Sequence, residues 1–305
     1  MDAEQDFPSF AVSNLTYKEH AKYLSHVFWI DGFPWVDYNR VLMPLPMPHI
    51  SVDTDRAGLR KVLKQSGCLL AVWTTEWDTS QVTEWWWTCY DRQPVSVDNI
   101  SDRRGRRSVR KGLRCCTVRR VHPEEYAESG FPIYCAACEQ YGVSAPTLEE
   151  FREGAKRSAA YRGSEFWGAY YDEIMVAYAT CVVQDDAVSL GSTKSLPDYD
   201  KYQSNAALFY SICEHYSQRG LRYITNGSRT LWHPTQINDY LQRLGFRKVY
   251  CRLNLEMSPP LAAVHKTQLL HLAGALHLEK VIGRPWHKLM GLAKLVDIAE
   301  SFGDR

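Results

Sequence analysis

A short polar group directly before a helical segment is the most concentrated candidate for chemistry in this sequence. Lys201, Gln203, Ser204 and Asn205 precede a stretch in which apolar residues recur at helical spacing up to position 218. The N-terminus of a helix offers unpaired backbone N–H groups and a partial positive charge, so a phosphate group is a suitable ligand there. An ordinary helix cap with one solvated lysine is the alternative interpretation.

A second candidate group lies in the sequence Asn-Gly-Ser-Arg-Thr-Leu-Trp-His-Pro, which begins at Asn226. A histidine side chain ordinarily titrates near neutral pH and can accept the proton of an attacking amine, so we predict His233 as the general base. Asn226 and Arg229 can orient oxygen atoms of a substrate. The alternative is that His233 and Pro234 only begin the next helix.

Basic residues are concentrated in one segment. Residues 103–120 contain nine Lys or Arg and no acid, although the net charge of the whole chain is only +1. On a helix, Arg107, Arg110 and Lys111 lie on a face opposite Val109 and Leu113. Such a face suits a phosphorylated acceptor, an anionic lipid or the phosphates of a tRNA. A solvated or internally paired face is the alternative. The pI of about 7.6 favours one focused anion site over a general nucleic-acid-binding protein.

The nine cysteines do not form a metal-binding pattern. Cys135 and Cys138 have the CxxC spacing, but no second such pair or histidine pair completes four zinc ligands. We therefore expect no metal, and reduced thiols that pack as small apolar side chains. The acidic N-terminus resembles no signal peptide and no run of 18 apolar residues occurs, so a cytoplasmic protein without a transmembrane segment is expected.

The first half of the chain is predicted to consist of short elements. In order, these are a helix over 14–27, an irregular aromatic loop over 28–48, strands over 68–74 and 84–90, a helix over 102–113, a strand over 116–121, and helices over 124–141 and 147–160. In the second strand, alternation places Trp85 and Trp87 on one face and Trp86 on the other.

The second half is more regular. The pattern predicts a three-strand meander over 166–171, 174–183 and 187–195, a helix over 205–218 capped by Asn205, a strand over 221–225, a helix over 235–244 and a final strand over 248–257. Two tail helices, over 261–276 and 289–299, combine apolar and basic residues. They could contact an anionic membrane surface, but docking on the rest of the chain is the simpler expectation.

This order of elements, together with the sequence Leu-Gln-Arg-Leu-Gly-Phe-Arg-Lys from Leu241, resembles the acetyl-CoA-binding half of the GNAT acyltransferases. The Arg-rich sequence from Arg106 to Val118 is similar to a helix and strand of FemABX-like proteins, which are GNAT relatives with two related halves. The resemblance implies an α+β fold with a mixed, mostly antiparallel GNAT-like sheet flanked by helices. It implies a degenerate GNAT-like half over 1–121, a donor-binding half over 122–257 and a helical extension over 258–305.

The resemblance also implies a donor site. GNAT enzymes hold the donor pyrophosphate in a glycine-containing loop before the central helix, where this sequence has Lys201 to Asn205 without the glycines. Acyl-CoA is the expected donor, with Ser192 on the preceding strand as a further binding residue. The acid tyrosine of many GNAT members corresponds to Leu241 here, next to Tyr240 on the same helix.

The expected reaction is therefore acyl transfer to an amine of an amino sugar, a peptide or a lipid-linked precursor. His233, Asn226 and Tyr240 are the predicted catalytic residues, and Arg107, Arg110, Lys111 and Arg229 the predicted substrate or anion-binding residues. Aminoacyl-tRNA as the donor is one alternative. A non-catalytic GNAT-like binding module is another.

Overall fold

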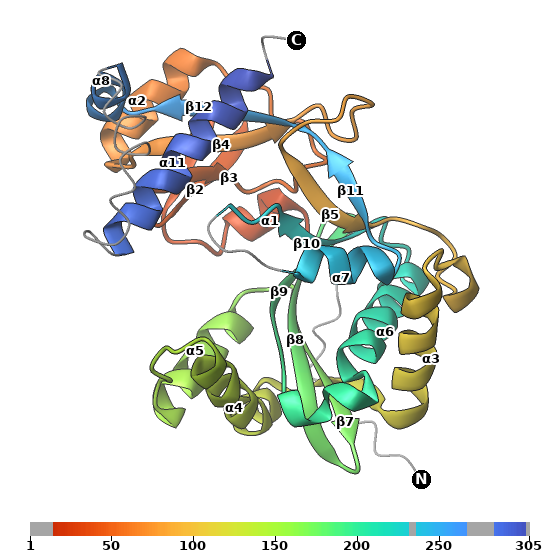
Figure 1. Ribbon diagram of the computed structural model, residues 1–305. Coiled ribbons are helices and arrows are strands. Elements are labelled where there is room, and N and C mark those ends of the chain that lie inside the picture. The colour runs from red at the N-terminus through yellow and green to blue at the C-terminus, as the bar shows by residue number, and fades with distance from the viewer. Residues whose placement is uncertain (1–14, 232–235, 267–283, 303–305) are drawn as a thin grey trace. The chain divides into compact units, whose positions relative to one another are not determined.

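The computed structural model describes residues 15–231, 236–266 and 284–302. The predicted fold class is confirmed, because mostly antiparallel strands form two sheets that are flanked by helices (Figure 1). The helical elements are α1 (Tyr17–Ala21), α2 (Arg56–Ser66), η1 (Val97–Asn99), α3 (Arg103–Cys115), α4 (Pro123–Gln140), α5 (Leu148–Ala160), η2 (Pro197–Tyr202), α6 (Ser204–Gln218), α7 (Ile237–Arg243), α8 (Pro259–Lys266) and α11 (Arg284–Ser301), of which η1 and η2 are 3-10 helices.

The strands follow the same order along the chain. They are β1 (Val27–Ile30), β2 (Phe33–Tyr38), β3 (Val41–Pro44), β4 (Leu70–Thr75), β5 (Trp86–Tyr90), β6 (Thr117–Val121), β7 (Ser164–Tyr171), β8 (Ile174–Gln184), β9 (Ala187–Ser195), β10 (Tyr223–Ser228), β11 (Arg247–Tyr250) and β12 (Arg252–Met257).

The chain divides into two compact units, each built from stretches that are distant in sequence. Unit 1 combines Met1–Thr16, Thr88–Gly227 and Ile237–Arg247, and unit 2 combines Tyr17–Trp87, Ser228–Gln236 and Lys248–Arg305. The domain boundaries expected at residues 121 and 257 stay a prediction.

A seven-stranded sheet with the order β11-β5-β10-β9-β8-β7-β6 forms the centre of unit 1. The strands β6 to β9 pair as antiparallel neighbours, which confirms the predicted meander. β9 and β10 pair in parallel. Helices α4 and α5 lie on one side of the meander, and α3 and α6 lie on the other (Figure 1).

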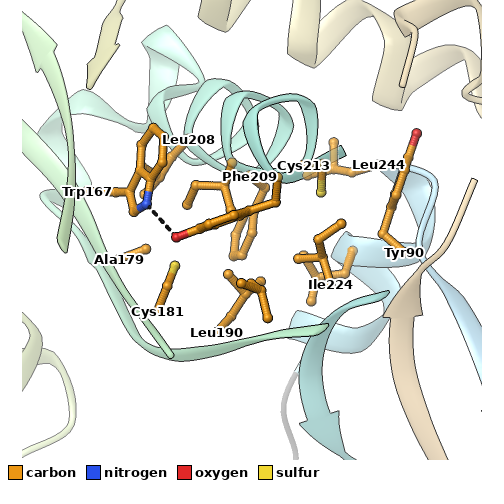
Figure 2. Close-up of a cluster of buried hydrophobic side chains, with 14 of the residues drawn as sticks. Tyr90, Trp167, Ala179, Cys181, Leu190, Leu208, Phe209, Cys213, Ile224 and Leu244 are labelled. Carbon is orange, nitrogen blue, oxygen red and sulfur yellow. Dashed lines mark hydrogen bonds between the residues drawn. The ribbon is translucent and has the colours of Figure 1, made fainter. Parts of the chain in front are cut away.

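The core of unit 1 forms where α6 packs on the sheet. Phe209, Leu208 and Cys213 of α6 meet Ala179, Cys181 and Leu190 of the meander, and all six side chains are buried (Figure 2). One polar contact lies within this apolar cluster, where Trp167 Nε1 donates a hydrogen bond to the Tyr216 hydroxyl over 3.2 Å. Burial of this size is the main favourable term in folding, so α6 is held firmly against the sheet.

Unit 2 contains a five-stranded sheet with the order β1-β2-β3-β4-β12. The prediction of an irregular loop over 28–48 was wrong, because this segment forms the three strands β1 to β3. Two-residue turns with positive φ join them: Asp31 and Gly32 have φ of 50° and 81°, and Asn39 and Arg40 have 54° and 66°. Two adjacent residues with positive φ match the twist of an antiparallel pair and so allow tight hairpins.

The predicted single strand over 248–257 was also wrong, because it consists of β11 and β12 in two different sheets. Cys251 separates them, is fully buried, and donates its backbone N–H to Trp85 O over 3.0 Å. β12 pairs antiparallel with β4 of unit 2, with Leu255 opposite Val72. The break therefore lets one chain segment serve two sheets.

The alternation predicted for the three tryptophans is confirmed. Trp85 Nε1 and Trp87 Nε1 both donate to Thr74 Oγ1, over 3.1 and 3.4 Å. Trp86 faces away from them, with Lys248 Nζ 4.6 Å from its ring centroid.

Part of the C-terminal tail packs on unit 2. The helix predicted over 289–299 lies within α11, which contacts β12 and buries Ala293, Val296 and Ile298. The helix predicted over 261–276 begins as α8 and then passes out of the described residues. Across the described ranges, no helix combines the length and apolar character needed to cross a bilayer. In those same ranges, no group of three or more His, Cys, Asp or Glu is placed to hold a metal ion.

Candidate functional site

The two parallel strands of unit 1 separate after a short contact. Only Tyr223, Ile224 and Thr225 of β10 lie opposite residues of β9, with Thr225 opposite Ser189. β9 continues to Ser195, and within the described part of the chain its residues 190–195 have β8 as a neighbour on one edge and no recorded partner on the other. Unused backbone N–H and C=O groups along this edge can accept an extended ligand that contains amide groups.

Helix α6 begins close to the end of this open strand. Gln203 occupies its N-cap with φ of 62° and ψ of 37°, a left-handed conformation that usually favours glycine. A glutamine thus holds the backbone conformation that usually favours glycine at the start of α6. Its side-chain Nε2 donates to Asp200 O over 3.0 Å, and no side chain caps the first turn of α6 among the described residues.

The prediction that Asn205 caps α6 was wrong, because Gln203 takes that position and Asn205 lies in the first turn. Asn205 Nδ2 donates to Ser195 Oγ over 2.8 Å, which ties the helix start to the end of β9. Thr193, two residues from Ser195, lies on the same face of the strand. Thr193 Oγ1, Ser204 Oγ and Asn205 Oδ1 are buried and have no hydrogen-bond partner within the described ranges. Buried polar atoms are normally paired, so three unpaired ones indicate a place for water or a ligand.

Tyr240 of α7 belongs to the same region of unit 1. Its ring packs against Phe209 with 6.3 Å between centroids. Burial raises the pKa of the Tyr240 hydroxyl, and the Asp200 carboxylate raises this pKa further. The phenol is therefore protonated at neutral pH and a weaker acid than a solvated tyrosine, and it carries a proton for a leaving group. The adjacent Leu241 is fully buried in the core, and its apolar side chain has no proton to donate.

Helix α3 packs against the start of α6 through small residues. Its buried face consists of Gly105, Val109 and Gly112. A Cβ atom on Gly112 would lie 2.5 Å from Gln203 O, so the two backbones approach as closely as glycine allows. The prediction that Leu113 shares the face of Val109 was wrong, since Leu113 is 40% exposed. Glycines, which carry no apolar signal, form the packing face instead.

The three predicted cations of α3 have different surroundings. Arg110 pairs with Asp98 over 2.6 Å, so its charge is internally balanced. Arg107 and Lys111 are exposed, and neither makes a recorded ion pair in the described structure. These two side chains are the ones able to meet an external anion.

The remaining predicted residues lie elsewhere. Ser192 is on the α4 side of the sheet, beside the buried Tyr178 hydroxyl, rather than with Asn205. Asn226 follows the last residue of β10 that pairs with β9 and is half-buried. Arg229 is in unit 2, where its guanidinium pairs with Glu84. His233 lies outside the described residues.

One feature near the site is absent from the sequence prediction. Tyr171, at the end of β7, forms an aromatic cluster with Tyr199 and Tyr202 of η2. Lys194 lies instead on the α4 side of β9 with Ser192, where its Nζ is 5.5 Å from the Tyr141 ring centroid and burial lowers the pKa of its ammonium group. The pattern Tyr-Asp-Lys-Tyr in η2 was a local signal for the aromatic cluster, but Tyr171 is brought to it only by the fold.

No family model matches the sequence, and no curated protein matches it either. Among solved structures, the C-terminal domain (DUF2156) of a putative lysylphosphatidylglycerol synthetase from Agrobacterium fabrum is similar with a TM-score of 0.54 and 10% identity, covering 86% of this chain and 95% of that one. A conserved protein of unknown function from Bacteroides thetaiotaomicron VPI-5482 has a TM-score of 0.50 and 11% identity, with 78% and 90% covered. FemX has a TM-score of 0.49 and 9% identity, with 77% and 89% covered. The shared arrangement is a GNAT-like fold, and these likenesses extend to the fold alone.

Proposed function

We propose that this GNAT-like chain, of the FemABX-like branch, is an N-acyltransferase that moves an acyl group from acyl-CoA to an amine. The observation that supports this most directly is the start of α6, where Thr193 Oγ1, Ser204 Oγ and Asn205 Oδ1 are buried without partners beside the open edge of β9. A helix start with free N–H groups suits a diphosphate, and an open strand edge suits the amide-containing arm of the donor.

Each residue of the site has a proposed role. The first-turn backbone of α6 and Lys201 would hold the diphosphate, while residues 190–195 would pair with the pantetheine amides. The acceptor nitrogen would attack the thioester carbonyl, forming a C–N bond as the C–S bond breaks. Tyr240 would give its proton to the departing sulfur, and His233 would take the proton that the amine loses.

The finer assignments belong to the same proposal. The acceptor would be an amine of an amino sugar, a peptide or a lipid-linked precursor. The protein would act in the cytoplasm without a metal ion, and peripheral contact with a membrane would suit a lipid-linked acceptor.

Calorimetric titration with acetyl-CoA tests the donor site. Asn205→Asp keeps a residue that suits a helix N-terminus but places a negative charge beside the diphosphate. We expect about tenfold weaker binding, equivalent to about 1.4 kcal/mol. Lys64→Glu is the control, because Lys64 is an exposed lysine of unit 2. Equal affinity in wild type and Asn205→Asp would contradict the proposed site.

A kinetic test separates chemistry from binding. Tyr240→Phe removes only the hydroxyl, so we expect kcat to fall about a hundredfold while acetyl-CoA affinity stays unchanged. An unchanged kcat with a panel of amine acceptors would remove Tyr240 from the mechanism.

A second candidate function is transfer from aminoacyl-tRNA. Arg107 and Lys111 of α3 favour it, since both are exposed, have no ion-pair partner among the described residues and can meet phosphates. Filter binding with tRNA at two salt concentrations tests this candidate, because each phosphate contact adds to the salt dependence of the affinity. Tight, salt-dependent tRNA binding combined with no acetyl-CoA binding would favour it over the first.

A further inference from the structure

Three tyrosines of unit 1 form a stacked aromatic cluster next to the start of α6. The rings of Tyr171 and Tyr202 stack with 3.9 Å between centroids and 24° between planes. Tyr199 lies 5.9 Å from Tyr171 and 6.0 Å from Tyr202. All three side chains are half-buried rather than enclosed. A planar ligand can therefore extend the stack, as bases do on aromatic residues.

A lysine and the end of helix α3 lie beside this cluster. Lys201 Nζ lies 5.1 Å from the Tyr202 ring centroid. Helix α3 contacts η2, and Cys115 at the end of α3 lies near the Tyr171 hydroxyl. The close approach of Gly112 to Gln203 O fixes α3 against the residue that follows Tyr202.

The two flanks of α3 differ in how their charges are balanced. At 100° per residue, Lys111, Arg107 and Arg104 lie on the flank of Cys115, at spacings of three and four. All three are exposed and make no recorded hydrogen bond or ion pair within the described ranges. On the other flank, Arg106 donates to Ile100 O over 2.6 Å and Arg110 pairs with Asp98. Exposed cations with no partner among the described residues therefore line the flank next to the tyrosines, and Arg103 and Arg114 on the outward face are exposed in the same way.

We propose that this surface, formed by Tyr171, Tyr199, Tyr202, Lys201, Lys111 and Arg107, binds a nucleoside phosphate. The base stacks on the tyrosines, and the phosphates meet the three cations. The buried, unpartnered Ser204 Oγ and Asn205 Oδ1 mark the adjoining start of α6 as a place where a polar ligand group fits. This inference rests on the proposed function, because the nucleotide belongs either to the acyl donor or to a nucleotide-linked acceptor.

Calorimetric titrations with ADP, UDP and ribose 5-phosphate test the inference on the full chain. Wild type is expected to bind a nucleotide about tenfold more tightly than ribose 5-phosphate, because only the nucleotide can stack. A preference for ADP indicates the donor as the source, and a preference for UDP indicates the acceptor. Equal affinity for ADP, UDP and ribose 5-phosphate would overturn the inference.

Variants separate stacking from charge. Tyr202→Ala is expected to remove the tenfold advantage of the nucleotide, whereas Tyr202→Phe keeps it. Lys111→Glu is expected to weaken ADP but not adenosine, and it alters an exposed residue that the fold does not require. Tyr38→Ala is the control, since Tyr38 is a tyrosine of unit 2 that is 67% exposed. If Tyr202→Ala and Lys111→Glu both bind ADP as wild type does, the surface is not the site.

A failure of this inference can be distinguished from a failure of the proposed function. Acyl transfer that proceeds without any nucleotide preference removes this inference and keeps the function. Nucleotide binding that depends on Tyr202, in a protein that transfers no acyl group, keeps the inference and removes the function.

Discussion

Gly112 determines how closely α3 approaches the candidate site. Its missing side chain leaves room for Gln203 O and for Ala207, which a Cβ atom would approach to 2.5 and 3.0 Å. Because the neighbour at 2.5 Å is backbone, it cannot move aside as a flexible side chain would. The packing of α3 against α6 therefore depends on this one position, although glycine gives no hydrophobic signal in the sequence.

We predict that Gly112→Ala lowers the free energy of unfolding by about 1–3 kcal/mol, the usual cost of overpacking. Gly154→Ala is the matched control, because Gly154 is also within a helix but its nearest neighbour is an Arg157 side-chain atom at 4.0 Å. That control is expected to be neutral or to add about 0.5–1 kcal/mol. Urea denaturation measures both, and equal stability of the two variants would contradict the prediction.

His215 gives the protein a dependence on pH. Its ring lies 5.0 Å from that of Trp167. Burial lowers the pKa of His215, Arg120 and Arg219 lower this pKa as well, and Glu165 opposes them. The unfolded chain therefore binds a proton more readily, so stability contributed by neutral His215 is complete above pH 6.5 and is lost as the pH falls toward its folded pKa.

We therefore expect wild type to lose stability between pH 7.5 and pH 5.5 in urea denaturation. His215→Gln cannot titrate, so its loss over the same interval should be smaller. If the two proteins show the same pH dependence, another group is responsible, and His20, whose pKa burial also lowers, becomes the next candidate.

At the level of elements, the clearest predictions came from residues with local hydrogen-bonding roles. Thr147 and Glu150 form a capping box with both reciprocal bonds at the start of α5, where the sequence predicts a helix over 147–160. By contrast, β1 to β3 were missed although Asp31-Gly32 is a known hairpin pair, because prolines and aromatic residues obscured the alternation around it. The separation of β11 from β12 at Cys251 could not be predicted, since it depends on which distant strands each half pairs with.

We predict that Thr147→Ala costs about 1 kcal/mol of stability, because it removes the acceptor for the Glu150 N–H. Thr147→Ser retains the hydroxyl and should keep most of the stability. Thermal unfolding of both variants measures the difference, and a Thr147→Ala protein as stable as Thr147→Ser would show that α5 does not depend on its cap.

The candidate site was predicted in part. Lys201, Gln203, Ser204 and Asn205 do lie at a helix start, because a run of polar residues before an apolar period is a local signal. Thr193 and Ser195 were missed because only the strand pairing places them beside α6.

At the level of the whole molecule, the chain passes between the two units more than once, and this determines which unit a truncation affects. A chain ending at residue 283 lacks α11. It exposes the surface of unit 2 against which Ala293, Val296 and Ile298 are buried in the full chain. We expect it to bind a dye for exposed apolar surface and to unfold at lower urea concentration. It should still bind acetyl-CoA, because the candidate donor site is in unit 1. If the truncated chain lost acetyl-CoA binding together with stability in urea, the two units would not behave independently.

The pairing of β4 with β12 also determines when the sheet of unit 2 can be completed during synthesis. Asn254 Nδ2 donates to Thr75 Oγ1 across 179 residues of sequence. At about 5–20 residues per second, the ribosome needs roughly 10–40 s to add that length. During this time one edge of β4 has no partner strand, and an open edge can pair with other chains. We expect nascent unit 2 to need protection, by a chaperone or by slow initiation, until its last strand leaves the ribosome.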